Sequence, residues 1–248
     1  MTGLLTRITE QPPEVLDAIA NSMNVRASEP AMKAICARYM ARIALSEGAR
    51  VLEIGCGNPS SAFIDMAGKA FAGEPRVSFA TGDATATGQA DGCFDLVIAH
   101  TVYSHLVEPE RALAEAHRVL RPGGQLAIFD GDFATLTVAL FDGDPLQVVA
   151  GMVLRNLVHA PYVMRRLPAL VAAAGFSVQS VEPHGYVQTS SPDYLLTLLS
   201  RGTHAAVQAG EISEELVGGF NQEARRRVAS GTFYGAILFL SITARKDG

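Results

Sequence analysis

The sequence has no hydrophobic run long enough to cross a membrane as a helix. Hydrophobic residues make up 48% of the 248 residues, yet the longest apolar stretches, such as Ala236–Leu240, are short. A membrane-spanning helix needs roughly 20 consecutive apolar residues. Residues 1–10 also lack the basic start and sustained apolar segment of a secretory signal. We therefore expect no membrane partner and a cytoplasmic location.

Positive charge is not in excess either. Lysine and arginine together number 20 against 25 aspartate and glutamate residues. A chain without surplus cations releases few counterions from a phosphate backbone, so sequence-independent nucleic-acid binding is not expected. The charge balance favours a neutral or cationic small molecule as the partner, and it does not reveal the oligomeric state.

Cysteine is scarce and unpatterned. The three cysteines, Cys36, Cys56 and Cys93, are widely spaced, with no Cys-x-x-Cys motif and no histidine pair at metal-ligand spacing. We therefore expect no metal site and no disulfide, and we interpret the three residues as free thiols of a reducing compartment.

The first half of the chain has the pattern of an α/β protein. Apolar side chains at helical intervals over residues 13–47, with a helix start at Ser28–Pro30, predict two helices. A further helix is predicted over Glu108–Leu120, where Pro109 suits the first turn and Gly123-Gly124 closes the helix. Short runs rich in β-branched or aromatic residues predict strands at Arg50–Ile54, Val77–Ala80, Phe94–Ala99 and Gln125–Phe129. Strand, helix and strand in succession indicate a parallel sheet.

The second half predicts helices over 145–174 and 192–229, with strands near 178–181 and 234–244. Pockets in such sheets lie outside the carboxyl ends of the strands. Segments 131–170 and 185–230 have room to form a substrate pocket there, and the N-terminal helices to cover it. We expect one domain over 1–248, in which an N-terminal helical cap (1–47) precedes a cofactor-binding core (48–183) and a helical insertion with the last strand (184–248).

Four motifs carry the chemistry. Val51–Gly57 is an apolar strand that bears one acid, Glu53, and breaks into a glycine turn, where a nucleotide-like ligand can approach the backbone closely. Val77–Ala84 is a strand with an acid, Asp83, just past its end. The other two motifs are a strand that leads into a short loop, Phe94–His105, and the turn Leu120-Arg-Pro-Gly-Gly124 before a further strand.

These four motifs in this order resemble the class I S-adenosylmethionine-dependent methyltransferases, in particular the small-molecule, type 11-like group. The resemblance covers roughly residues 30–180. It implies a Rossmann-like, doubly wound, mostly parallel sheet with a helical insertion over the substrate. It also implies S-adenosylmethionine as cofactor and methyl transfer to a small organic acceptor by in-line displacement.

The resemblance also assigns cofactor-binding residues. Glu53, Gly55 and Gly57 match the motif that lies against the methionine part of the cofactor, and Asp83 and Ala84 match the adenine contacts. His100 and Thr101 match the end of the strand that closes over the cofactor. A tight turn would also explain the glycines, and a helix N-cap would also explain Asp83.

The chain departs from the family after Gly57. The family places a complete helix and a second strand there, ending in an acid that holds the ribose hydroxyls. Here the chain runs directly into Asn58–Ala70, where Asn58 stands near that acid's place and Ser60 and Ser61 suit a helix cap. We therefore expect one strand fewer than the usual seven. A deletion, a different local path and a segment omitted from the sequence all remain open.

Other residues give weaker signals, and no catalytic residue can be assigned. His105 is expected either to assist a hydroxyl acceptor as a base or to orient its loop. His159 and His184 are expected to be ordinary pocket or surface residues, and the Arg225-Arg-Arg227 run a solvated helix face. Tyr103, Tyr162, Tyr186, Phe233 and Tyr234 form an aromatic wall in one interpretation and core in the other.

Two rival functions are considered. A nicotinamide oxidoreductase fits poorly, because the turn Gly55–Ser60 lacks the third glycine of G-x-G-x-x-G. A non-catalytic or repurposed methyltransferase-like protein with impaired cofactor binding is the stronger alternative, since the cofactor crossover is short and a fold does not guarantee its chemistry.

Overall fold

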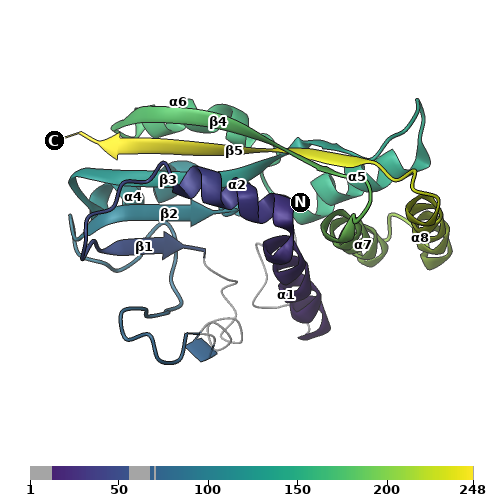
Figure 1. Ribbon diagram of the computed structural model, residues 1–248, viewed down its shortest axis with the longest axis horizontal. Helices are drawn as coiled ribbons and strands as arrows, with labels where there is room; N and C mark the ends of the chain where they lie inside the picture. The colour runs from purple at the N-terminus through teal and green to yellow at the C-terminus, as the bar shows by residue number, and fades with distance from the viewer. Residues whose placement is uncertain (1–12, 56–67, 70, 248) are drawn as a thin grey trace.

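The computed structural model describes residues 13–55, 68–69 and 71–247, and all structural statements below concern these residues. Five strands form one sheet in the order β1-β2-β3-β5-β4 (Figure 1). Their bounds are β1 Val51–Ile54, β2 Phe94–His100, β3 Leu120–Thr137, β4 Phe176–Gln188 and β5 Gly235–Lys246.

The sheet is mostly parallel. The β1–β2 and β2–β3 pairs are parallel, and β5 lies antiparallel to both β3 and β4. Four strands therefore point the same way and only β5 is reversed. The predicted Rossmann-like α/β class is confirmed.

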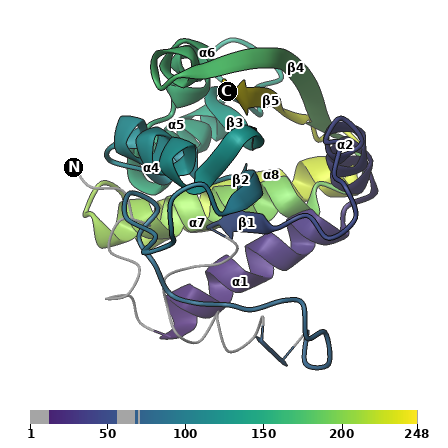
Figure 2. The ribbon, with the colours of Figure 1, turned by 90° about the vertical axis from the view of Figure 1, so that its left-hand side faces the viewer.

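Helices cover both faces of this sheet, as Figure 2 shows. On one face lie α4 (Pro109–Val119) and α6 (Val163–Ala173), and on the other lies α2 (Pro30–Met40). Beyond the strand ends lie α1 (Pro13–Ser28), α5 (Pro145–Leu157), α7 (Asp193–Gln208) and α8 (Glu214–Ala229). None of the described helices is long and apolar enough to span a bilayer.

The alternation of side chains along the strands builds two separate cores. Phe129 packs on the α2 side with Tyr39 and Phe239, whereas its neighbour Ile128 packs with the helices α4 and α6. Successive side chains of a strand point to opposite faces, so a strand covered on both faces is buried along its length. Eight consecutive residues of β3, 126–133, are accordingly buried, and they include Asp130 and Asp132.

The predicted strand Val77–Ala80 is wrong. These residues have no strand assignment, and the only pairing nearby is the isolated bridge between Asp83 and Ala86. An extended segment becomes a strand only where a neighbour pairs its N–H and C=O groups. The described residues supply no strand beside β1 on the side away from β2. Within the described residues the sheet has five strands, so the expectation of fewer than the usual seven is confirmed.

The role expected for Gly123-Gly124 is also wrong, since α4 ends at Val119 and β3 starts at Leu120. The two glycines lie inside β3 at a register shift, where Phe94 pairs with Leu120 but Leu96 already pairs with Gln125. A Cβ on Gly124 would lie 2.9 Å from the Arg121 carbonyl oxygen. The glycines therefore permit a bulge rather than a helix end.

The remaining elements were predicted with inexact bounds. The helical stretch 145–174 is two helices, α5 and α6, and the stretch 192–229 is likewise α7 and α8. The strand β4 extends from Phe176 to Gln188, across the boundary drawn at 183/184 between the predicted core and insertion. The proposed division of the chain into cap, core and insertion remains a prediction.

Candidate functional site

The carboxyl end of β1 is a glycine turn packed against β2. Gly55 has φ +76°, a left-handed conformation that favours glycine. A Cβ added there would lie 2.3 Å from Cγ2 of Val102, the second residue after β2. The turn is therefore tight both in backbone conformation and in space, and it joins the ends of the two strands. Gly57, and with it Asn58, Ser60 and Ser61, lies outside the described residues.

Glu53 lies one residue before the end of β1. Its side chain is exposed on one side, while the protein around it desolvates the carboxyl and raises the pKa of Glu53. Burial raises the pKa of Tyr39, and the charges of Cys36 and Glu53 add to that shift. Glu53 is thus an acceptor at the strand end, with solvent access on one side.

His100 ends β2 and is turned toward α2. Its Nδ1 lies 3.1 Å from the Tyr39 hydroxyl, and its ring packs 4.8 Å from that of Phe129. Burial, and to a lesser extent the charge of Arg26, lowers the pKa of His100 to about 4. The imidazole is therefore neutral at pH 7, and its side chain is engaged with the core beside the strand end.

Thr101 follows His100 with φ 55°, and it is the only non-glycine residue with positive φ among those described. Its N–H donates to the Phe129 carbonyl at 2.6 Å, and Arg26 Nη2 of α1 donates to its Oγ1 at 3.1 Å. Such a conformation costs about 1–3 kcal/mol and persists where the surroundings hold it, commonly at functional sites. The helix α1 therefore reaches the carboxyl end of β2, as expected of a cover.

Asp83 and Ala84 lie in the segment that returns to the sheet. Oδ1 of Asp83 accepts from Thr85 N–H at 2.7 Å and from Thr85 Oγ1 at 2.9 Å, and these hydrogen bonds lower the pKa of Asp83. The carboxylate is thus ionised and exposed, and it caps a turn. Ala84 is partly buried against the core cluster that β1, β2 and α4 share. Thr87 N–H donates to Oε1 of Glu115 at 2.7 Å, so this segment lies against α4.

A buried carboxyl lies behind the loop that follows β2. Asp130 of β3 is fully buried and accepts hydrogen bonds from Ser104 N–H, Ser104 Oγ and Gly131 N–H. Burial raises the pKa of Asp130 to about 6 despite these donors. The hydrogen bonds fix the 3₁₀ turn η2 (Tyr103–His105) at the end of the sheet.

The predicted histidines occupy different places. In η2, burial and then the charges of Arg201 and Arg26 lower the pKa of His105 to about 3. His159 lies beside it, because Ala160 N–H donates to the Ser104 carbonyl at 2.9 Å. His184 lies within the sheet, where its Nε2 is 2.8 Å from Ser241 Oγ.

The predicted aromatic wall divides into two groups. Tyr103, Tyr186 and Phe233 are buried, and the first two have hydroxyl oxygens with no hydrogen-bond partner in the described structure. Tyr162 and Tyr234 are exposed. Three of the five therefore belong to the interior.

The expectation of a solvated Arg225–Arg227 face is wrong for Arg227. This residue is 1% exposed, and its two terminal nitrogens donate to both carboxylate oxygens of Asp144 at 2.7 and 2.9 Å. Arg226 is exposed and pairs with Glu223 on its own helix. One member of the run, Arg227, thus forms a buried ion pair with Asp144, which fixes α8 to the start of α5.

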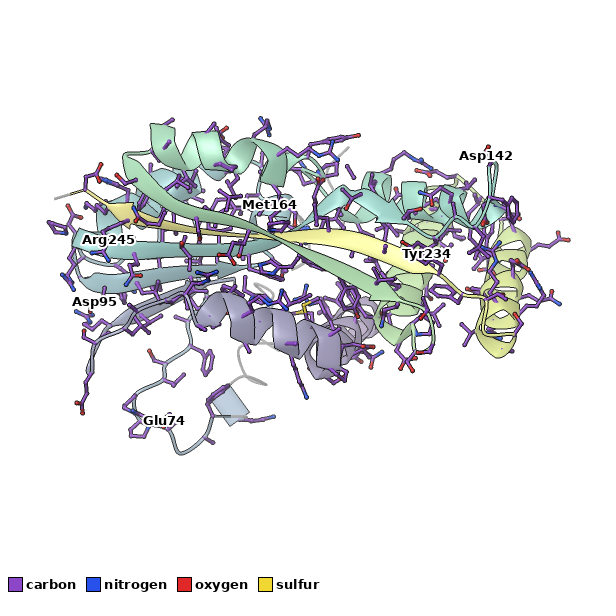
Figure 3. All side chains as sticks on the ribbon, turned by 45° about the horizontal axis from the view of Figure 1, so that its top comes forward. Glu74, Asp95, Asp142, Met164, Tyr234 and Arg245 are labelled. Atoms are coloured by element: carbon purple, nitrogen blue, oxygen red, sulfur yellow. The ribbon has the colours of Figure 1, made fainter. Side chains whose placement is uncertain are left out.

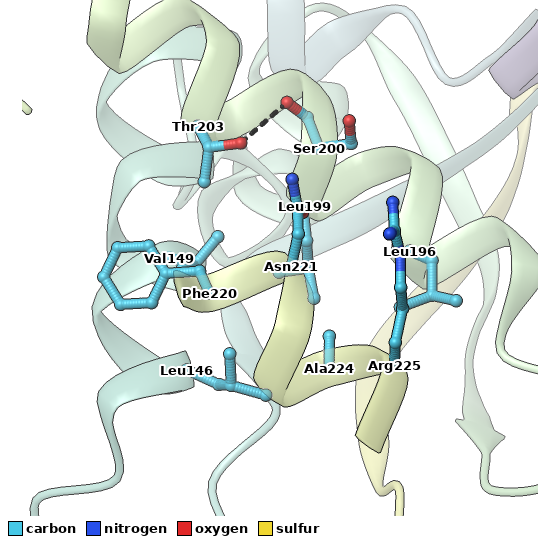
Figure 4. Close-up of a pocket in the computed structure, with 10 residues that line it drawn as sticks. All are labelled: Leu146, Val149, Leu196, Leu199, Ser200, Thr203, Phe220, Asn221, Ala224 and Arg225. Carbon is cyan, nitrogen blue, oxygen red and sulfur yellow. Dashed lines mark hydrogen bonds between the residues drawn. The ribbon is translucent and has the colours of Figure 1, made fainter. Parts of the chain in front are cut away.

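Two cavities lie near the helices beyond the strand ends. One lies between α5, α7 and α8 (Figure 4), and none of the predicted cofactor residues lines it. The other is lined by the loop after η2 and the start of α6, including Leu106, His159 and Arg166. The second cavity is thus the one that adjoins η2.

The predicted residues are therefore partly brought together. Gly55 contacts Val102, the residue after Thr101, and Ala84 packs in the same cluster. Glu53 lies two residues before Gly55 in the chain, and Asp83 is the neighbour of Ala84. Acceptors from Glu53 and Asp83 next to a turn without a side chain suit a ligand with cationic and N–H groups, so the described residues fit the predicted cofactor.

Sequence reasoning missed two arginines. Arg26 of α1 donates to Thr101 at the end of β2, and Arg201 lies on α7 one turn after Thr197, which contacts Ser22 of α1. Each stands in the buried stripe of its helix, Arg26 after Ile19 and Ser22, and Arg201 after Tyr194 and Leu198. An arginine at a helical position where buried residues are expected is a sequence signal that could have identified Arg26 and Arg201.

Comparison with known proteins finds a family match over part of the chain. Residues 34–128 match the model of a methyltransferase domain. An uncharacterized 37.1 kDa protein in transposon TN4556 of Streptomyces fradiae is 30% identical over 204 residues, which is 82% of this chain and 57% of that protein. The chain spans about half the length of the curated relatives it matches.

Two solved structures share the fold. A putative methyltransferase from Bacillus halodurans is 18% identical, with a TM-score of 0.60 over 86% of this chain and 98% of the other. The [4+2]-cyclase SpnF is 19% identical, with a TM-score of 0.57 over 94% of this chain and 95% of the other.

Proposed function

We propose that this chain, a member of the class I S-adenosylmethionine-dependent methyltransferases, methylates a small organic acceptor. The methyl group comes from S-adenosylmethionine and is transferred by in-line displacement. The observation that carries the proposal is the junction of the first two strands. There, Gly55 in a left-handed turn packs on Val102 beside Thr101.

Each predicted residue has a role in this proposal. Glu53 and Gly55 hold the methionine part of the cofactor, the acid by accepting from its amino group and the glycine by leaving the backbone open. Asp83 and Ala84 contact the adenine, and His100 and Thr101 form the wall at the end of β2. Gly57 belongs to the same turn by sequence.

The cofactor, when bound, supplies an activated methyl group together with its leaving group, so the protein's contribution is alignment and exclusion of water. The described residues suit that contribution. Arg26 fixes Thr101, and Asp130 fixes Ser104 of the following turn. Both contacts hold the loop after β2 at the place where an acceptor would meet the methyl group.

No general base is assigned. A base is most effective when its pKa is near the working pH. The pKa values of His100 and His105, about 4 and about 3, lie well below neutrality. In this proposal the two histidines therefore shape the site, and His105 orients its loop rather than taking a proton.

Calorimetric titration with S-adenosylmethionine and S-adenosylhomocysteine tests the proposal. We expect one-site binding of both ligands. Absence of heat at high micromolar ligand, with the protein folded by circular dichroism, would refute it.

A non-catalytic or repurposed protein is the second candidate. Two observations favour it: the outer edge of β1 lacks a strand partner within the described residues, and the same fold occurs in a [4+2]-cyclase. If this candidate holds, cofactor analogues will not bind, or will bind without any methyl transfer to an acceptor that the protein also binds.

A further inference from the structure

Basic side chains from four separate elements converge beyond the carboxyl ends of β2 and β3. Arg26 of α1 contacts Thr101, and Ser22 Oγ lies 3.0 Å from Thr197 Oγ1, which fixes α1 against α7 about one turn before Arg26 and Arg201. Ala160 N–H donates to the Ser104 carbonyl at 2.9 Å, which holds His159 next to the turn that carries His105. Burial, and then the charges of Arg201, Arg26 and His159, lower the pKa of His105.

Several nitrogens in this group have no hydrogen-bond partner. Among the described residues, His105 Nδ1, His159 Nδ1 and Arg201 Nε are buried and unpartnered. Leaving a buried polar atom unsatisfied costs about 1–3 kcal/mol. Three such atoms in one cluster, supplied by three elements, point to a ligand that would satisfy them.

The charges of this cluster are not balanced either. The charge of Arg26 acts on Asp130, but the Asp130 carboxyl already receives three hydrogen bonds from Ser104 and Gly131. Within the part of the chain that the structure describes, no carboxylate lies within 4.0 Å of Arg26 or Arg201. Burial and the charge of Arg26 both lower the pKa of Arg201, while only Tyr194 opposes them.

Other arginines that approach the interior are paired. Arg227 has Asp144, and Arg165 donates from Nε to Asp132 at 2.8 Å. An unpaired cation out of solvent is costly, because its hydration is lost without a compensating charge. Arg201 has no such partner among the described residues, and a substrate can bring the counter-charge.

We propose that Arg201, together with His105 and His159, binds a carboxylate of the acceptor substrate. This inference rests on the proposed function and names the substrate class of that site. A guanidinium offers parallel N–H donors that match the two oxygens of a carboxylate, and a neutral imidazole can add one N–H. The acidic net charge favoured a neutral or cationic partner, but the local cluster decides which ligand fits.

Titration with small carboxylates tests this site. The probes are acetate and benzoate, with acetamide and benzamide as neutral analogues of the same shape. The protein is titrated in the presence of saturating S-adenosylhomocysteine, and the Nε–H resonances of its arginines are followed by NMR. We expect a saturable shift of the Arg201 resonance with at least one carboxylate, and no shift with the amides. The Arg201→Gln variant assigns the resonance.

Arg245 provides the matched control. It is exposed near the end of β5 and pairs in register with Gln125, at the amino end of β3. Figure 3 labels it near Asp95, at the opposite end of the sheet from Tyr234. We expect Arg201→Gln to weaken carboxylate binding roughly 10- to 100-fold, the loss of a charged hydrogen bond. Arg245→Gln should leave it unchanged, and both variants should keep their affinity for S-adenosylhomocysteine.

The outcomes separate the two proposals. Equal binding of carboxylates and amides, no binding of either, or equal effects of the two substitutions overturns the carboxylate site. If carboxylates bind but S-adenosylhomocysteine does not when titrated alone, the proposed function fails and the anion site stands.

Discussion

Replacement of Gly55 by alanine tests how much stability depends on the absence of a side chain at this turn. Two costs add at this position. A left-handed backbone costs a non-glycine residue about 1–2 kcal/mol. A Cβ at 2.3 Å from Val102 Cγ2 forces the neighbours apart, and such overpacking costs about 1–3 kcal/mol. We therefore expect Gly55→Ala to lower the free energy of unfolding by about 2–5 kcal/mol.

Gly48 is a matched control in the same chain. Its φ is +75°, almost equal to that of Gly55, but a Cβ there would meet nothing within 4 Å. Gly48→Ala should therefore lose only the backbone part, about 1–2 kcal/mol. Adding Val102→Ala to Gly55→Ala should recover part of the packing loss, since the two residues are in contact and their effects are coupled.

Urea unfolding followed by circular dichroism measures these differences, and calorimetry measures binding of S-adenosylhomocysteine. Gly55→Ala should weaken that binding by about tenfold or more, equivalent to about 1.4 kcal/mol, while Gly48→Ala leaves it unchanged. Equal loss of stability in the two single variants, with unaltered binding in both, would refute the reasoning about this turn.

Three further predictions concern stability, pH and substrate. Arg227→Ala leaves Asp144 buried without its partner and should cost about 3–5 kcal/mol, whereas Arg226→Ala on the exposed side should cost less than about 1 kcal/mol; thermal unfolding of both compares them. Burial raises the pKa of Asp130 to about 6 in the folded protein. Between about pH 4 and pH 6 the Asp130 carboxyl is therefore protonated in the folded protein but ionised in the unfolded chain. Stability should therefore fall by up to about 3 kcal/mol as pH rises from about 4 to 6, and Asp130→Asn should remove that part of the slope in urea titrations at several pH values. The third prediction is that Arg201→Gln weakens carboxylate binding; an affinity equal to that of the unaltered protein would contradict it.

The elements that the sequence predicted well are those with a local cause. The strand Phe94–His100 is a buried apolar run, and α4 carries proline at its first turn and apolar residues at helical spacing. Val77–Ala80 has an equally good local pattern but forms no strand. A strand depends on a partner, and partners are set by the whole topology rather than by the run itself.

The site shows the same division. Gly55 and Thr101 were predicted from the motifs that resemble the family, and the structure places them directly after β1 and β2. Arg26 and Arg201 lie far apart in sequence, and packing of α1 on α7 brings them together. Arg227 looked solvated within a run of three arginines, although it lies on the helix face of Phe220 and Ala224. Charge runs say little about which member turns inward.

We propose that the ends of β1 and β2 form the cofactor site. Backbone amide NMR spectra, recorded while S-adenosylhomocysteine is added, test this placement. We expect saturable shifts at Gly55, Ala84 and Thr101 with a single binding constant. Shifts confined to the cavity between α5, α7 and α8, or no shifts at all, would contradict it.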